Sequence, residues 1–110
     1  MANQPPSDGT IIALITCAGA AEAERIATAL IEARLAACAQ WHGHASLYRW
    51  QGRLERGEET RLLVKTTRAA WPGLLAMARA LHSYDLPAIL AVEPCAILPE
   101  FADWVRAETS

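Results

Sequence analysis

The chain has 110 residues, enough for one domain built around one hydrophobic core. Its 10 basic and 12 acidic residues leave a net charge of −2, which gives no basic surface for nucleic acid or for an anionic membrane. Hydrophobic residues make up 53% of the chain, more than so small a domain buries, and this excess predicts an oligomer.

The first residues of the chain and its cysteines indicate in which cellular compartment the protein is located. Residues 1–9 have neither the basic start nor the apolar segment of a signal peptide, so we expect a short disordered tail before a single domain over residues 10–110. No apolar run reaches the roughly 18 residues that a membrane span needs. Cys17, Cys38 and Cys95 are odd in number and far apart, which favours reduced thiols and a cytoplasmic location over a disulfide framework.

The first predicted elements are a strand and a helix. Thr10 to Cys17 is a short apolar run rich in isoleucine, and it predicts a central strand buried on both faces. A helix is expected from about Ala20 to Ala37, because apolar residues recur on one face and charged residues on another. The alanines of the apolar face allow a close approach to a sheet.

A long hairpin is expected next. Alternation with period two runs from about Ala39 to Leu54 and again from Glu59 to Thr67. We expect the chain to reverse at residues 55–58, where Gly57 can take positive φ. Two arms of this length exceed what one small domain can cover, so their far end is predicted to reach a neighbouring subunit.

The remaining elements complete the fold class. A second helix is expected over about Ala69–Leu81, with Pro72 in its first turn, and a strand over Ala88–Val92. A short C-terminal helix is expected to begin at Pro99. The order β-α-β-β-α-β plus a helix predicts an α+β, ferredoxin-like sandwich.

Candidate metal ligands lie at the end of the first strand and in the loop after the second helix. A thiolate at Cys17 suits Cu(I) or Zn, although a small buried cysteine in a strand-to-helix turn is the alternative. His82 offers imidazole, and Asp85 and Tyr84 offer a carboxylate and a phenol as further ligands or partners. The alternative for His82 is an interaction with the carbonyl groups at its helix end.

The hairpin carries further candidates. Tyr48 and Trp50 share one face, where they form either a subunit interface or the lining of a ligand cleft. Lys65 is the only lysine and lies in an interior strand, so it needs a carboxylate or an anion. Glu59 projects to the same face about 20 Å away, so it can reach Lys65 only from another subunit.

Two histidines follow each other on the first arm of this hairpin. His42 and His44 are two residues apart, so both imidazoles face the same side of the strand. This spacing can chelate a metal ion, but no third ligand is evident. Solvated histidines at a strand edge are the alternative.

Several short motifs resemble the CutA family of divalent-cation tolerance proteins. They are Leu35-Ala36-Ala37-Cys38, Tyr48 with Trp50-x-Gly52, Glu59, Lys65-Thr66-Thr67 and His82-x-Tyr84-x-x-Pro87. The resemblance extends from about Thr10 to Arg106. It implies a compact and stable homotrimer in which the long hairpins of neighbouring subunits pair edge to edge, with Tyr48, Trp50 and Glu59 at the interface.

The same resemblance implies a function in divalent-metal tolerance, especially toward copper. It implies ligands at Cys17, at His82 and at a glutamate after the loop proline, a position that holds Ala88 here. Asp85 is then the candidate to replace that carboxylate. The predicted function is a homotrimer, not an enzyme, that binds Cu²⁺ or another divalent cation through Cys17, His82 and Asp85.

Three other functions are weighed against this one. A trimeric small-molecule or anion sensor similar to the PII signalling proteins would use Lys65, Arg61 and Tyr84 as cleft contacts, but the glycine-rich phosphate loop is missing. An acylphosphatase on this fold is disfavoured, because its chemistry needs an asparagine and Asn3 is the only one. A structural or interaction trimer is the third alternative.

Overall fold

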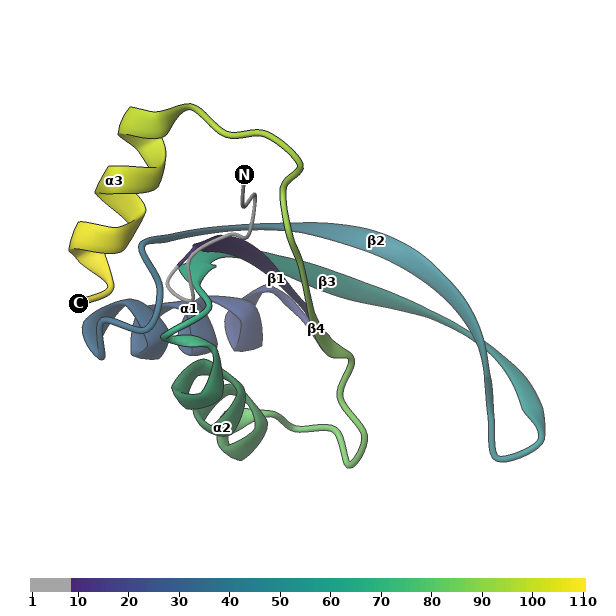
Figure 1. The fold of residues 1–110 in the computed structure, drawn as a ribbon. Helices are drawn as coiled ribbons and strands as arrows, with labels where there is room; N and C mark the ends of the chain where they lie inside the picture. The colour runs from purple at the N-terminus through teal and green to yellow at the C-terminus, as the bar shows by residue number, and fades with distance from the viewer. Residues whose placement is uncertain (1–8) are drawn as a thin grey trace.

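The structure, a computed structural model, describes residues 9–110. Seven elements follow one another along the chain: β1 (Thr10–Cys17), α1 (Ala20–Glu32), β2 (Cys38–Trp50), β3 (Arg53–Thr67), α2 (Trp71–Leu81), β4 (Ile89–Val92) and α3 (Pro99–Glu108) (Figure 1). This order confirms the predicted α+β, ferredoxin-like fold with its C-terminal helix. The expected disordered tail lies outside the described residues except for Gly9, whose carbonyl accepts a hydrogen bond of 2.9 Å from the Arg68 amide.

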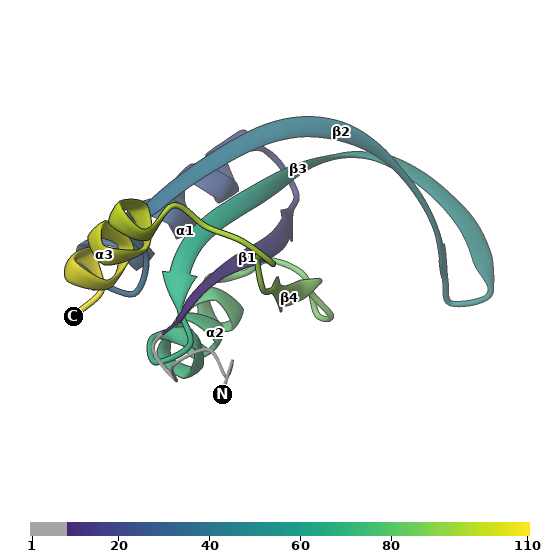
Figure 2. The ribbon, with the colours of Figure 1, turned by 45° about the horizontal axis from the view of Figure 1, so that its top comes forward.

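The four strands form one sheet in the order β2-β3-β1-β4. All three neighbouring pairs are antiparallel. Helices α1 and α2 lie on one face of the sheet, and α3 lies over one end of the other face (Figures 1 and 2). Among the described residues, the sheet is therefore fully covered on one side only.

Strand β1 shows this asymmetry residue by residue. Its side chains toward α1 and α2 are buried, and those toward the other face are only half-buried. The expectation of a strand buried on both faces is therefore wrong for the single chain, because within residues 9–110 no second layer covers most of the α3 side.

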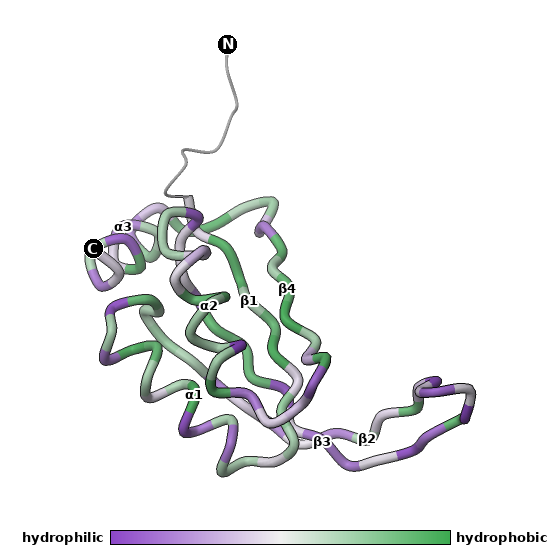
Figure 3. Tube along the Cα trace, turned by 90° about the horizontal axis from the view of Figure 1, so that it is seen from below, coloured by the Kyte–Doolittle hydropathy of each residue, from purple (hydrophilic) through white to green (hydrophobic). Residues whose placement is uncertain are grey.

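The hydrophobic core lies between the sheet and helices α1 and α2. Its largest fully buried side chains come from both layers: Ile15, Ile26, Leu30, Leu62, Val64 and Leu74. Ala23 and Ala27 on α1 are also buried, and their small size lets the helix approach the sheet closely. Figure 3 shows hydrophobic residues along β1 and β4 and mainly hydrophilic residues toward the far end of the hairpin.

Helix α1 ends at Glu32, five residues before the predicted end at Ala37. Arg34 has φ of 60°, the Arg34 amide donates to the Ile31 carbonyl, and the Leu35 amide donates to the Leu30 carbonyl at 2.9 Å. This is a Schellman ending, which usually has glycine at the left-handed position. The prediction missed it because an arginine occupies that position.

The hairpin also reverses earlier than predicted. Gln51 and Gly52 have φ of 51° and 80°, and Trp50 pairs with Arg53, so the turn is a two-residue turn with positive φ at both central positions. The predicted reversal at residues 55–58 is wrong, since those residues pair with β2. The resulting arms extend beyond the body of the molecule (Figure 2). The principal dimensions of the whole described chain are 49 × 31 × 21 Å.

The second half of the fold follows the prediction closely. Pro72 lies in the first turn of α2, and Pro99 begins α3. Strand β4 begins at Ile89, one residue later than predicted. The loop between α2 and β4 passes beside the end of β1, where the Thr16 amide donates to the Ala88 carbonyl at 3.1 Å.

Candidate metal centre and the adjoining groove

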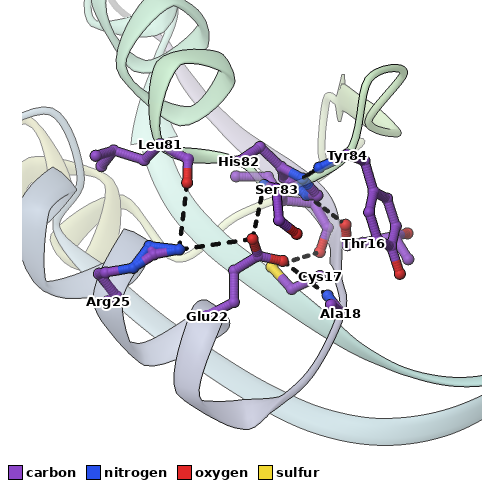
Figure 4. A network of polar contacts seen from close by, with 10 residues as sticks. Thr16, Cys17, Ala18, Glu22, Arg25, Leu81, His82, Ser83 and Tyr84 are labelled. Atoms are coloured by element: carbon purple, nitrogen blue, oxygen red, sulfur yellow. Dashed lines mark hydrogen bonds and ion pairs between the residues drawn. The ribbon is translucent and has the colours of Figure 1, made fainter.

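Three potential metal ligands meet where β1 ends, α1 begins and the loop after α2 passes (Figure 4). Their ligand atoms, the thiol of Cys17, the carboxylate of Glu22 and the imidazole of His82, all lie within 4.8 Å of one another. The segments that supply them are far apart in sequence and are joined by the fold. This group is called the Cys17–Glu22–His82 cluster below.

Glu22 links the three segments. It lies in the first turn of α1 and is 8% exposed. Its carboxylate accepts hydrogen bonds of 2.8 Å from the amides of Ala18 and Ser83, and it lies 3.6 Å from the guanidinium of Arg25. Burial alone would raise the pKa of Glu22, but the hydrogen bonds from Ala18 and Ser83, together with the charge of His82 when protonated, lower it. Glu22 is thus ionised at neutral pH.

His82 is held in one orientation by both ring nitrogens. Nδ1 accepts a hydrogen bond of 3.1 Å from the Tyr84 amide, so in the neutral ring the proton is on Nε2. Nε2 lies 2.7 Å from the Thr16 carbonyl and donates to it. The alternative to metal binding that the sequence offered for His82 was a contact with carbonyl groups at the end of its own helix. The His82 side chain contacts the Thr16 carbonyl instead.

Cys17 is the innermost member of the cluster. Its side chain is fully buried, and the thiol is 3.9 Å from the Ile15 carbonyl. Burial, and next the negative charge of Glu22, raise the pKa of Cys17 to about 11, while Arg25 opposes this effect. The thiol is therefore protonated at neutral pH.

The donor set fits a borderline or soft metal ion. Sulfur, imidazole nitrogen and carboxylate oxygen are ligands that Cu and Zn accept together. Each ligand is nevertheless engaged within the chain, and Cys17 holds its proton. Binding a metal ion here therefore requires loss of the thiol proton and release of at least one hydrogen bond at Glu22 or His82.

The cluster contains two of the three residues that were predicted as metal ligands. Cys17 and His82 are brought together, but Asp85 is exposed and is not part of the cluster. Glu22 takes the third place and was not predicted. A signal for it exists, because a glutamate in the first turn of a helix commonly reaches back to an amide at the helix start, here that of Ala18.

A groove of about 770 Å³ adjoins the cluster, between the loop after α2 and the concave side of the hairpin. The predicted cleft residues Arg61 and Tyr84 and the predicted interface residues line it together: Tyr48, Trp50 and Glu59. Asp85 and Ala88 also lie on its wall. The cleft and the interface patch that the sequence presented as separate possibilities are therefore one surface in the single chain.

Lys65 does not lie in this groove. Its ammonium donates to the side-chain oxygen of Gln40 at 2.8 Å, so its partner is an amide and not the expected carboxylate or anion. Glu59 also has a partner within its own chain, since it accepts a hydrogen bond of 2.8 Å from the Tyr84 hydroxyl. Burial, with this contact to Glu59, raises the pKa of Tyr84.

The fold and the cluster together define a small ferredoxin-like α+β protein with a candidate site for a metal ion. The chain belongs to the CutA1 divalent ion tolerance protein family, whose profile matches residues 11–108. Within residues 9–110, no helix is both long and apolar enough to cross a membrane.

Relatives from bacteria and archaea are similar over nearly the whole chain. The divalent-cation tolerance protein CutA of Thermus thermophilus is 43% identical over 99 residues, which cover 89% of this chain and 96% of the relative. The solved structure of the Thermus thermophilus protein superimposes with a TM-score of 0.88 and covers 92% of this chain and 99% of the other. A structure from Archaeoglobus fulgidus, described as the periplasmic divalent cation tolerance protein CutA, has a TM-score of 0.89 at 34% identity, with the same two coverages.

Proposed function

We propose that this protein acts in divalent-cation tolerance by binding one metal ion per chain at the Cys17–Glu22–His82 cluster, with copper as the ion. The observation that carries this proposal is the meeting of three different ligand atoms within 4.8 Å. Family membership supports it, because the relatives are named for divalent-cation tolerance. The ion is cargo that the protein holds, and no catalytic step is proposed.

The ligand chemistry favours copper over the harder cations. Imidazole and thiolate select Cu and Zn, and Cu²⁺ binds nitrogen and sulfur ligands more strongly than the other first-row divalent ions. Mg²⁺ and Ca²⁺ prefer sites made of oxygen ligands, and the cluster supplies only one carboxylate. Asp85 lies on the wall of the adjoining groove, outside the cluster, and in this proposal it assists the cluster as an additional carboxylate.

A competition titration tests the site. The reduced protein is titrated with Cu(II), Cu(I) and Zn(II) against a chelator of known affinity. We expect one site per chain that is weakened at least about tenfold in Cys17→Ala and in His82→Ala, since each substitution removes a ligand and even the loss of a ligand's hydrogen-bond partner costs about 10–100-fold. Cys95→Ala and His42→Ala, which change exposed residues outside the cluster, are the controls and should leave the affinity unchanged.

The outcome is clear in either direction. Unchanged copper affinity in both Cys17→Ala and His82→Ala would refute the assigned site. A loss in Asp85→Asn equal to that in His82→Ala would move the third ligand from Glu22 to Asp85.

The proposal extends to a homotrimer. The far part of the hairpin presents large apolar side chains to solvent, with Leu47 and Leu54 exposed by 67% and 68%. Apolar area of this kind is the usual mark of a subunit contact. Analytical ultracentrifugation should give the mass of three chains, and a monomer at micromolar concentration would contradict this part of the proposal.

The cytoplasm is the proposed compartment. Cys17, Cys38 and Cys95 are all free thiols, as is usual in a reducing compartment. The Archaeoglobus fulgidus neighbour is described as periplasmic, so the location of this protein needs its own test. Fractionation of the source cells provides that test. Recovery of the protein with periplasmic markers would overturn this assignment.

A further inference from the structure

Arg25 holds a positive charge beside the Cys17–Glu22–His82 cluster (Figure 4). One nitrogen of its guanidinium lies 3.6 Å from the carboxylate of Glu22 and also donates to the Leu81 carbonyl at 3.3 Å. Leu81 is the last residue of α2 and directly precedes His82. These two contacts keep the charge at the cluster, although the side chain of Arg25 is 51% exposed.

The charges at the cluster add up to one negative charge when a metal ion is bound. Cys17 then contributes a thiolate, Glu22 is ionised, His82 ligates as the neutral ring, and Arg25 supplies one positive charge. After burial, the charges of Glu22 and Arg25 are what shift the pKa of the Cys17 thiol, up and down respectively. Asp85 is exposed and lies outside the cluster. A singly charged ion therefore leaves the site neutral, whereas Zn²⁺ or Cu²⁺ leaves one positive charge.

Burial makes this remaining charge costly. Cys17 is fully buried, and Glu22 is 8% exposed. A charge without compensation costs more free energy away from water than at the surface, so a buried site favours the ion that neutralises it. The charges around the cluster thus favour Cu⁺ over the two divalent ions.

The hydrogen bonds of the cluster favour the same ion. The carboxylate of Glu22 is engaged by the amides of Ala18 and Ser83 and by Arg25. Thiolate and imidazole together suit Cu(I), which does not depend on a carboxylate. Glu22 can therefore complete the set as a weak third donor without losing its amide contacts. Within residues 9–110, no fourth Cys, His, Asp or Glu joins the group, whereas Zn²⁺ usually takes four ligands.

We propose that the cluster holds copper as Cu(I), and that Arg25 selects this ion by its charge. This choice of ion rests on the proposed function, because it takes the cluster as the copper site. It adds the oxidation state of the ion and a residue that selects the ion without binding it. The reductants that keep the three free thiols of the chain reduced also keep copper as Cu(I).

The test compares a singly and a doubly charged ion on the same protein. The full-length, reduced protein is titrated under nitrogen with Cu(I) and with Zn(II), each against a chelator of known affinity. Ag(I) and Cd(II) form a second pair whose oxidation states do not change. The measured quantity is the ratio of the two affinities. A general loss of ligand geometry lowers both affinities, so the ratio isolates the effect of charge.

Substitutions of Arg25 then show whether its charge selects the ion. In Arg25→Gln we expect the ratio of Cu(I) to Zn(II) affinity to fall at least about threefold, because removing a positive charge a few ångströms away favours a divalent ion more than a monovalent one. Arg25→Lys keeps the charge and should keep the ratio near that of the wild type. Arg79→Gln is the matched control, because Arg79 is an exposed arginine in the last turn of α2 that contributes no atom to the cluster. It should leave the ratio unchanged.

X-ray absorption spectroscopy of the copper-loaded wild type gives a second measurement that needs no variant. We expect a Cu(I) edge and two or three donor atoms, one of them sulfur. Circular dichroism shows whether Arg25→Gln, Arg25→Lys and Arg79→Gln keep the fold. The spectroscopic measurement remains decisive even if one of these variants does not.

Two results would overturn the proposal. One is an equal change of Cu(I) and Zn(II) affinity in folded Arg25→Gln, which would show that the charge does not select the ion. The other is four donor atoms around the bound copper, because a further ligand from a second copy of the chain would alter the count of charges. Both results leave the site in place. Failure of the proposed function is distinguishable, since Cys17→Ala and His82→Ala would then bind copper as tightly as the wild type.

Discussion

At the scale of single residues, Glu22 joins three separate segments. Its two hydrogen bonds to the amides of Ala18 and Ser83 connect the end of β1, the start of α1 and the loop after α2. The same carboxylate is the proposed oxygen ligand of the metal. One side chain therefore has a structural role and, in the proposed function, a metal-binding role as well.

We predict that Glu22→Gln destabilises the metal-free protein by about 1–3 kcal/mol at pH 7, because the neutral amide accepts hydrogen bonds less strongly and turns a donor toward the two backbone amides. Urea denaturation monitored by circular dichroism measures the change. Glu24→Gln, an exposed substitution on the same helix, is the control and should have little effect.

The effect of Glu22 should depend on pH in a defined direction. The pKa of Glu22 is lowered in the folded chain from its ordinary value of 4.5. Its stabilising contribution is therefore complete above that value and is lost as the pH falls through the folded pKa. The difference in stability between wild type and Glu22→Gln should therefore shrink as the pH falls below the ordinary value of 4.5. A difference that stays constant down to pH 3 would contradict this account.

Cys17 makes a second prediction for pH, concerning metal affinity. The pKa of its thiol is raised to about 11, so across neutral pH a metal ion must displace the thiol proton. We expect apparent copper affinity to rise about tenfold per pH unit from pH 6 to pH 9, after correction for the chelator. Cys17→Ser should lose most of this slope. A slope near zero in the wild type would mean that the thiol does not ligate the metal as thiolate.

At the scale of elements, Arg34 connects the end of α1 with the end of α3. Its backbone takes the left-handed conformation that ends α1. Its guanidinium donates to the carbonyl groups of Ser110 at 2.7 Å and Ala107 at 2.8 Å. The Arg34 side chain thus caps the C-terminal end of α3, a contact that a glycine at this position could not make.

The two roles of Arg34 can be separated by a pair of substitutions. Arg34→Ala keeps the backbone strain and loses the cap, whereas Arg34→Gly loses the cap but relieves the strain. We expect both to be less stable than wild type, and the glycine variant to be more stable than the alanine variant by about 1 kcal/mol. Thermal unfolding gives the order. An alanine variant as stable as wild type would show that the cap contributes nothing.

At the scale of the whole molecule, the hairpin and the half-covered sheet leave apolar surface that one chain cannot bury. In the part of the chain that the structure describes, only α3 lies over the face of the sheet opposite α1 and α2, and Leu90 and Val92 of β4 are 48% and 45% exposed. The apolar excess of the composition is thus located on particular surfaces. These surfaces are what a trimer would cover.

We predict that Leu54→Asp shifts the assembly toward smaller species, because it places a charge in the apolar surface of the hairpin. Sedimentation velocity across a concentration series measures the shift. Thr28→Asp, which adds the same charge at an exposed position of α1 outside the hairpin, is the control for a simple change of charge. A trimer that persists unchanged in Leu54→Asp would exclude this part of the hairpin from the subunit contact.

Much of the fold was predictable from local patterns. Period-two alternation along β3, apolar spacing on the helices and the positions of Pro72 and Pro99 are each set by a few adjacent residues. The hairpin turn and the end of α1 were misplaced. Gln51 and Arg34 hold positive φ there, and neither residue type signals that conformation.

The sequence by itself determined the order of the elements and the family, because local periodicity and short motifs carry that information, and it predicted Cys17 and His82 as metal ligands. Only the tertiary structure decided that Glu22 joins this pair in place of Asp85, and that Lys65 lies apart from Arg61. These are contacts between segments distant in the chain. Their geometry depends on strand register and helix placement, which no local spacing specifies.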